Sequence, residues 1–165
     1  TLAWLSLPAA AGVGTSSFTA QASVHSNCTI AATPLTFGGY DPIGANRTTS
    51  LDATSSITVT CVKGTTPSIA LGNGLNASGT TRRMRDAPSG DFLVYEIYQP
   101  SSATPGAACS FPGTTVWGSS GGAVLNAGAA PSKAPRGYNV CGSVPAGQNP
   151  SVGTYADTVV ATVNF

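Results

Sequence analysis

The end of the chain, from Gly153 to Phe165, carries an alternating pattern of side chains. One set of alternate positions is mostly apolar and holds Tyr155, Asp157, Val159, Ala161, Val163 and Phe165. The other set is mostly hydroxyl or amide and holds Ala156, Thr158, Val160, Thr162 and Asn164. Successive side chains of a strand point to opposite faces, so the pattern predicts a strand with one apolar face. Because this strand finishes on a large apolar residue, we expect it to have a free edge that another strand must pair with.

The composition limits the partners that the chain can have. Only 8% of the residues are charged and the net charge is +1, whereas an ordinary soluble domain has roughly 25% charged residues. Neither nucleic acid nor an anionic membrane is therefore an expected partner. Hydrophobic residues make up 41% of the 165 residues, which is enough for the core of a single domain. The 20 Gly and 12 Pro favour many short strands joined by turns.

The chain contains four cysteines: Cys28, Cys61, Cys109 and Cys141. No two of them form a C-x-x-C pair, and a single histidine leaves no Cys/His zinc set. We therefore expect no metal and no cofactor. An even number of cysteines in a Thr-rich β chain favours two disulfides and an oxidising compartment, but their spacing leaves all three connectivities open.

A second alternating segment, residues 17–24, lies near the start of the chain and predicts a strand. Its apolar face holds Phe18, Ala20, Ala22 and Val24, and three residues separate it from Cys28. Further short strands are expected at residues 56–62, 68–71, 92–98, 114–117 and 138–144. No window outside them has the 3.6-residue apolar period of a helix. Short strands separated by turns predict an all-β fold, an antiparallel β-sandwich.

The first residues of the chain allow two interpretations, which stay open. Residues 2–7 are largely apolar, and residues 9–11 are alanines that suit a signal-peptide cleavage site. No initiator Met and no basic stretch precede them, so they are at most the back half of a signal peptide. The alternative is an ordered N-terminal extension of the mature protein. No stretch of the sequence is long enough to span a bilayer.

Two features could suggest an enzyme. Residues 118–122 match G-x-S-x-G, but a nucleophile elbow needs a helix after the Ser and a His later in the chain, whereas His25 precedes it. Asp157 could be a catalytic carboxylate, but nothing aligns it with Glu96 or Asp91 as an acid/base pair. A structural role for Asp157 is favoured, either capping a turn or meeting an Arg across strands. We therefore expect no catalytic residue.

The remaining conspicuous residues favour structural roles. Arg82, Arg83 and Arg85 form a basic cluster, but three cations are too few for nucleic-acid affinity. A surface patch or a subunit contact is the preferred interpretation. Tyr95 and Tyr98 lie on an otherwise apolar strand, so we expect them to pack rather than to stack on a sugar.

Several short motifs occur in a characteristic order along residues 16–165. They are Cys28-Thr-Ile, Phe37-Gly-x-Tyr40, Ile57-Thr-Val-Thr-Cys61, Leu71-Gly-Asn-Gly74, Arg82-Arg-Met84, Leu93-Val-Tyr95-x-x-Tyr98, Gly142-Ser-Val-Pro-Ala146, Gln148 and Gly153-x-Tyr155-x-Asp157-Thr-Val. Each motif alone is weak, but the ordered set resembles the spore coat protein U (SCPU) domain family. That family includes the pilins of archaic, Csu-type chaperone–usher pili.

The resemblance implies an incomplete immunoglobulin-like sandwich that lacks its last strand. The open groove would be filled first by a periplasmic chaperone and then by the N-terminal donor strand of the next subunit. In this chain, the resemblance implies a donor stripe of Phe18, Ala20, Ala22 and Val24. It implies an acceptor groove strand with Val159, Ala161, Val163 and Phe165.

The resemblance also implies a Cys28–Cys61 disulfide, which leaves Cys109 and Cys141, outside the most widespread family pattern, as the second pair. The expected domain organisation has three parts: an extension or signal-peptide remnant at 1–15, a donor strand at 16–27 and a pilin domain at 28–165. Residues 118–135 form a Gly/Pro-rich loop without a firm counterpart in the family.

The expected function is that of a structural, non-enzymatic subunit of an extracellular pilus, assembled through the periplasm and serving adhesion or biofilm formation. Its expected partners are identical or homologous pilin subunits in a polymer, a periplasmic chaperone and an outer-membrane usher. A binding module is the alternative. A two-domain tip adhesin would need roughly twice this length, and a self-contained coat protein would have to fold residues 17–24 into its own groove across a three-residue link.

Overall fold

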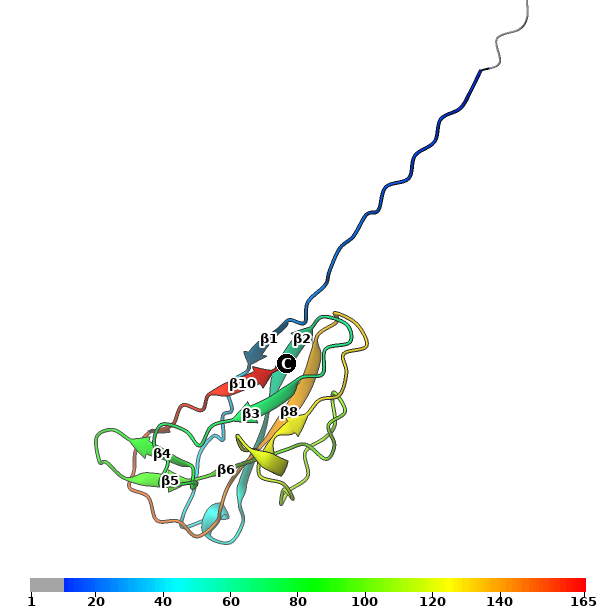
Figure 1. The fold of residues 1–165 in the computed structure, drawn as a ribbon. Helices are drawn as coiled ribbons and strands as arrows, with labels where there is room; N and C mark the ends of the chain where they lie inside the picture. The colour runs from blue at the N-terminus through cyan, green and yellow to red at the C-terminus, as the bar shows by residue number, and fades with distance from the viewer. Residues whose placement is uncertain (1–10) are drawn as a thin grey trace, which may run out of the picture.

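The computed structural model describes residues 11–165 and shows an all-β chain in two parts (Figure 1). Residues 11–27 form an extended arm that leaves the rest of the molecule, and residues 28–165 form the folded domain. Most of the segment that could be a signal-peptide remnant, residues 1–10, lies outside the described residues. Within residues 11–165, no helix has the length and apolar character needed to cross a bilayer.

The first sheet contains four antiparallel strands in the order β1-β2-β8-β6. These strands are β1 (Cys28–Ala32), β2 (Leu51–Cys61), β8 (Arg136–Val144) and β6 (Glu96–Tyr98). The central ladder joins β2 to β8 from Leu51↔Val144 to Val59↔Arg136. Strand β2 is longer than the predicted 56–62 because its Ser/Thr-rich first half also pairs with β8. Strand β1 is an edge strand that pairs only with β2 among the described residues.

Two smaller antiparallel sheets have the orders β10-β3-β7 and β5-β4-β9. Their strands are β3 (Ser68–Leu71), β7 (Leu125–Asn126), β10 (Ala161–Asn164), β4 (Arg83–Asp86), β5 (Phe92–Val94) and β9 (Tyr155–Ala156). Two short 3-10 helices lie in the loops, η1 (Ala45–Arg47) and η2 (Gly121–Ala123). The predicted strand at 114–117 is reduced to a single bridge between Val116 and Tyr98.

The core lies between the first sheet and the smaller sheets. Ile57, Val59 and Tyr138 of the first sheet meet Ile69, Leu71 and Leu125 of the second in one buried cluster. Trp117 is fully buried in it, and its indole N–H donates a hydrogen bond to the Ile69 carbonyl oxygen (2.8 Å). Sheets that bury alternate residues against each other form a sandwich. The predicted antiparallel, immunoglobulin-like β-sandwich is therefore confirmed.

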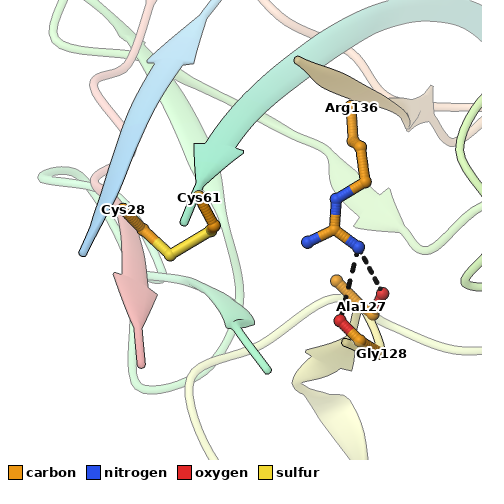
Figure 2. The surroundings of a disulfide bond; sticks show 5 residues. All are labelled: Cys28, Cys61, Ala127, Gly128 and Arg136. Atoms are coloured by element: carbon orange, nitrogen blue, oxygen red, sulfur yellow. Dashed lines mark hydrogen bonds between the residues drawn. A yellow bond between two sulfur atoms is a disulfide. The ribbon is translucent and has the colours of Figure 1, made fainter. Parts of the chain in front are cut away.

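Both expected disulfides are present. The Cys28–Cys61 bond joins the start of β1 to the end of β2, with Cα atoms 4.1 Å apart (Figure 2). The Cys109–Cys141 bond ties the loop after β6 to β8, with Cα atoms 5.5 Å apart. At the Cys28–Cys61 end of the sandwich, Arg136 Nη1 donates to the carbonyl oxygens of Ala127 (3.0 Å) and Gly128 (3.3 Å) (Figure 2).

The predicted strand 92–98 is divided between two sheets. Strand β5 pairs with β4, whereas β6 pairs with β8. The break is at Tyr95, whose backbone N–H donates to the Arg82 carbonyl oxygen (3.1 Å). The Gln148 side chain binds the N–H and the carbonyl of Val94 (2.8 and 2.9 Å), in place of a neighbouring strand. The side-chain pattern of residues 92–98 does not reveal such a change of partner.

The predicted surface patch of arginines is wrong for Arg82, which is only 1% exposed. Its guanidinium forms an ion pair with Glu96 and donates to the carbonyl oxygens of Gly72 and Trp117 (both 2.7 Å). A buried charge needs such partners. Arg83 lies over the ring of Phe92, with its guanidinium carbon 4.0 Å from the ring centroid.

Candidate functional site

An apolar groove opens along one side of the domain and has a volume of about 940 Å³. Residues 32–40 and Pro42 form its first wall, and residues 150–159 and Ala161 form its second wall. The two walls therefore come from the beginning and the end of the domain's sequence. The floor is made by core residues, among them Ile57, Leu71, Met84, Leu93, Ile97 and Val140.

The groove continues the gap between two unpaired sheet edges. Strand β1 ends the first sheet and β10 ends the second. They lie side by side and run in opposite directions (Figure 1), with Cα atoms within 8 Å of each other. No ladder joins them, and among residues 11–165 each pairs on one side only. The outer edges of both strands thus have no ladder partner within residues 11–165.

The first wall turns inward immediately after β1. Ser55 Oγ lies within hydrogen-bond distance of the carbonyl oxygens of Thr33 (2.6 Å) and Pro34 (3.0 Å), which holds the chain against β2. Leu35 and Phe37 then pack onto β8 at Gly142. A Cβ at Gly142 would lie 2.6 Å from Leu35 Cδ2 and 2.8 Å from Phe37 Cζ, so this close approach requires glycine.

The second wall is fixed by Asp157. Its Oδ1 accepts hydrogen bonds from the backbone N–H (3.0 Å) and the side-chain amide (3.1 Å) of Asn76, and its Oδ2 accepts one from Tyr95 OH (2.7 Å). Gly74, at φ +90°, passes so close that a Cβ there would collide with the carboxylate. The structural interpretation of Asp157 is therefore supported, with a turn and a tyrosine as its partners instead of an arginine.

The anchoring of Asp157 also corrects the prediction of one continuous strand at 155–165. The chain forms β9 and β10 with residues 157–160 between them. In this interval the carbonyl oxygens of Thr158 and Val160 accept from the N–H groups of Leu75 (3.1 Å) and Gly72 (2.9 Å). The side chain of Asp157 competes with the regular ladder, as Asp side chains commonly do.

Most of the groove lining is apolar, with threonines and Ser151 among its polar residues, and its one carboxylate, Asp157, is paired with Tyr95. Burial, together with the hydrogen bond and the negative charge of Asp157, raises the pKa of Tyr95 well above its usual value. Tyr95 therefore remains a protonated donor at neutral pH. Its ring packs edge-on against Phe37, with centroids 5.9 Å apart and planes at 66°. An apolar occupant can thus enter the groove without leaving these polar atoms unpaired.

The residues expected in the donor stripe lie outside the groove of their own chain. Phe18 is 92% exposed and Val24 is 82% exposed, and Ala20 and Ala22 are also exposed. The predicted strand at 17–24 is not formed, because these residues have no ladder partner within the described chain. The backbone is extended and points away from the domain (Figure 1).

The residues expected in the acceptor strand are spread along and beyond the groove. Val159 and Ala161 line it. Val163 is half-buried and packs against the edge of the core, outside the groove lining. Phe165 is 55% exposed and also lies outside the lining.

Sequence reasoning assigned no role to the first wall or to Met84. Leu35, Phe37 and Tyr40 line the groove from a Gly/Pro-rich stretch that has no strand-like alternation. The motif Phe37-Gly-x-Tyr40 was the available signal, since aromatic residues in such a stretch need a packing partner. Tyr40 also donates to the Pro145 carbonyl oxygen (2.9 Å).

The features that could have suggested enzymatic or metal chemistry do not converge. Residues 118–122 form a largely exposed segment whose last two residues begin the three-residue 3-10 helix η2, and His25 is in the arm. Glu96 is paired with Arg82, and Asp91 binds Ser151. No group of three or more His, Cys, Asp or Glu residues that could hold a metal ion occurs in residues 11–165.

Comparisons with known proteins match nearly the whole chain. The sequence model of the Spore Coat Protein U domain matches residues 14–162. "Protein U" of Myxococcus xanthus is 36% identical over 173 residues, which cover 96% of this chain and 88% of that protein. A crystal structure of the CsuC–CsuE chaperone–tip adhesion subunit pre-assembly complex, from archaic chaperone–usher Csu pili of Acinetobacter baumannii, has a TM-score of 0.59 and 28% identity. That match covers 86% of this chain but 40% of the solved chain.

Proposed function

Because the chain belongs to the Spore Coat Protein U domain family, we propose that it is a structural, pilin-type subunit of a chaperone–usher pilus. One observation carries the proposal. The domain has a largely apolar groove that continues the gap between two free strand edges, while an arm with a strand-like apolar stripe lies unpaired outside it. The likeness to a subunit of Csu pili supports the same role.

The proposed mechanism is β-augmentation by a second copy of the chain. The arm, residues 16–27, is the donor strand, and residues 28–165 are the pilin domain. Phe18, Ala20, Ala22 and Val24 enter the groove of the next copy. They lie beside β10 and the residues that flank it, which together hold Val159, Ala161, Val163 and Phe165. Main-chain hydrogen bonds to the free edges give affinity, and alternate side chains set the register.

The energetic reason for the arm to bind is the burial of its two large side chains. Burying a Phe or a Val contributes about 1.5–3 kcal/mol each. Two alanines separate Phe18 from Val24 on the same face. The two end residues therefore supply most of the apolar energy, and the alanines allow the backbone to lie close to the groove floor.

The remaining partners follow from the exposed groove. Before polymerisation, a periplasmic chaperone covers it, and an outer-membrane usher then exchanges the chaperone for the arm of the next subunit. The finished polymer of identical or homologous subunits lies outside the cell and serves adhesion or biofilm formation. The role is structural and involves no catalysis.

Three substitutions, two on the apolar face of the arm and one on the opposite face, test the mechanism. Ala22→Asp and Ala20→Asp place a charge without a partner in the apolar groove, which costs several kcal/mol. We expect both variants to stop polymerisation while the domain stays folded with its chaperone. Ser23→Asp, on the opposite face, is the matched control and should polymerise. The readout is the ladder of SDS-resistant oligomers in unheated samples, and normal ladders with Ala22→Asp would falsify the donor assignment.

A self-contained coat protein is the second candidate, because the likeness to Protein U extends over 96% of the chain. In that case the domain would be a stable monomer without a chaperone. The position of Phe18 and Val24 outside their own groove argues against it. Size-exclusion chromatography of the purified chain distinguishes the two, since a pilin subunit without a chaperone polymerises or aggregates.

A further inference from the structure

We infer that the loops at the far end of the groove form a docking surface for the copy of this chain whose arm fills the groove. The surface consists of Pro42, Ile43 and Val152, and we call it the groove-exit surface. The inference rests on the proposed donor-strand mechanism. It adds a contact between the folded bodies of successive subunits, beyond the contact made by the arm.

The groove-exit surface lies at one end of the groove, where both walls finish. In chain order, Pro42 is the last residue of the first wall, and Pro150 to Val152 are the first residues of the second. Ile43 is 90% exposed, and Val152 is fully exposed although it lines the groove. The adjoining 3-10 helix η1, cyan in Figure 1, lies at the end of the domain opposite the arm. Two aliphatic side chains thus flank one groove end without a packing partner among residues 11–165.

Hydrogen bonds hold these loops in place. Tyr40 OH accepts from the backbone N–H of Gln148 (3.0 Å) and donates to the carbonyl oxygen of Pro145 (2.9 Å). The backbone N–H of Gly147 donates to the Asn46 carbonyl oxygen (2.9 Å). Asp41 Oδ1 accepts from the N–H groups of Ile43 (3.2 Å) and Gly44 (2.9 Å). Hydrogen bonds therefore hold the loops that display the aliphatic side chains against each other, so the loops can present a fixed docking surface.

The direction of the inserted strand places its end at this surface. In an immunoglobulin-like sandwich the last strand runs antiparallel to the strand before it. Here that preceding strand is β10, which runs toward the end of the domain from which the arm leaves (Figure 1). A strand that completes the sandwich consequently runs the other way and ends at the groove-exit surface.

The link between arm and body is too short to hold the next subunit at a distance. Only residues 25–27 lie between Val24 and Cys28. At roughly 3.3–3.6 Å per residue, the four steps from Val24 to Cys28 span at most about 14 Å. The neighbour's β1 therefore begins beside the groove exit. The neighbour's turn at residues 62–66 lies beside the groove exit as well, because the Val62 N–H donates to the Asn27 carbonyl oxygen (2.9 Å).

Site-specific photo-cross-linking in the full chain, assembled with its chaperone and usher, tests the docking surface. A benzophenone side chain replaces Ile43 or Val152, and the matched control replaces Val116. Val116 is 42% exposed and bridges β6, the edge of the first sheet that is remote from β1. We expect positions 43 and 152 to give covalent subunit ladders that survive boiling in SDS and map to residues 25–27 or 62–66 of the neighbour. Position 116 should give no such link.

The outcomes separate this inference from the proposed function. Polymers that assemble normally but show no cross-link from positions 43 and 152, or show links to other parts of the neighbour, overturn the docking surface alone. A chain that forms no polymer, or one that polymerises normally with Ala22→Asp, overturns both.

Discussion

Two segments of this molecule have the same kind of sequence pattern and different structures. Residues 17–24 and the end of the chain at 155–165 both alternate between apolar and polar side chains. In the second segment, β10 pairs with β3 from Ala161↔Leu71 to Asn164↔Ser68. The first segment remains extended, exposed and unpaired.

The difference shows what alternation records. It specifies which face of a strand is to be buried, but it does not specify the chain that supplies the neighbouring strands. Strand β10 finds one neighbour in its own domain and keeps one edge free. The arm finds none in the described residues, and its Phe18 is 92% exposed, which is why we propose that its neighbouring strands belong to another molecule.

The largest expected effect comes from removing residues 163–165. This deletion takes away half of the β10 ladder and the chain end next to the free edge. We expect the chaperone to lose its hold on the subunit and the subunit to be degraded in the periplasm. Immunoblots of periplasmic extracts measure this, and deletion of residues 11–14, upstream of the donor stripe, is the control. Normal accumulation of the shortened chain would count against the assignment of the C-terminal edge.

The difference between the two segments should disappear when the arm is moved to the other end of the chain. A chain without residues 16–24 at its start, but with them appended after Phe165 through a short turn, gives the arm a ladder partner in its own chain. We expect a stable monomer. Burial of the Phe and Val adds up to about 3–6 kcal/mol, and each kcal/mol raises Tm by roughly 2–4 °C in a domain of this size.

Thermal unfolding and size-exclusion chromatography measure the two effects of moving the arm. The matched control carries the aspartate equivalent of Ala22→Asp in the appended segment and should lose the gain in Tm. An unchanged Tm in the version without the aspartate would mean that the stripe does not fit this groove.

A smaller loss is expected from Asp157→Ala, which loosens the second wall. It leaves the Asn76 N–H and the Tyr95 hydroxyl without their acceptor. Leaving buried donors unsatisfied costs about 1–3 kcal/mol. Urea unfolding should show a lower midpoint, and Tyr95→Phe, which removes one of these hydrogen bonds, should show a smaller shift. Equal stability of Asp157→Ala and the natural chain would show that Asp157 does not stabilise the second wall.

The smallest expected effect is on the pH dependence of stability. It comes from Asp86, which binds the start of the C-terminal segment at Thr154. Hydrogen bonds from Ser89 and from the Thr154 N–H lower the pKa of Asp86 below its ordinary value. The stabilisation is therefore complete above the unfolded-state pKa near 4 and is lost as the pH falls through the folded-state pKa. Asp86→Asn should reduce the difference in Tm between pH 7 and pH 3. An unaltered difference would show that other carboxylates account for the acid sensitivity.

The sequence predicted the fold class and several strands well, because those depend on local patterns. Strand β3 lies at the predicted residues 68–71. The two disulfides were expected from the family resemblance and are formed. The all-β sandwich follows from short alternating segments and turns, which need no knowledge of distant contacts.

What the sequence did not predict depends on contacts between distant residues. The break at Tyr95 arises because Gln148 binds Val94 in place of a strand. The interruption before β10 requires Asp157 to meet Asn76. The first wall of the groove has no periodic signal, since Phe37 is positioned by the space above Gly142. Local alternation carries no information about such partners. The first of the two walls of the candidate site was therefore not predicted.

In the proposed polymer, the position of the Cys28–Cys61 disulfide would determine how each subunit bears tension. A pull on the arm reaches the domain at Cys28, the first residue of a strand of only five residues. Without a covalent link, the load would peel this edge strand from β2 one backbone pair at a time. Cys28 and Cys61 are the first pair of that ladder, so the bond passes the load directly to β2. Strand β2 has 11 residues and is bound lengthwise to β8, and it can yield only by shearing many hydrogen bonds together.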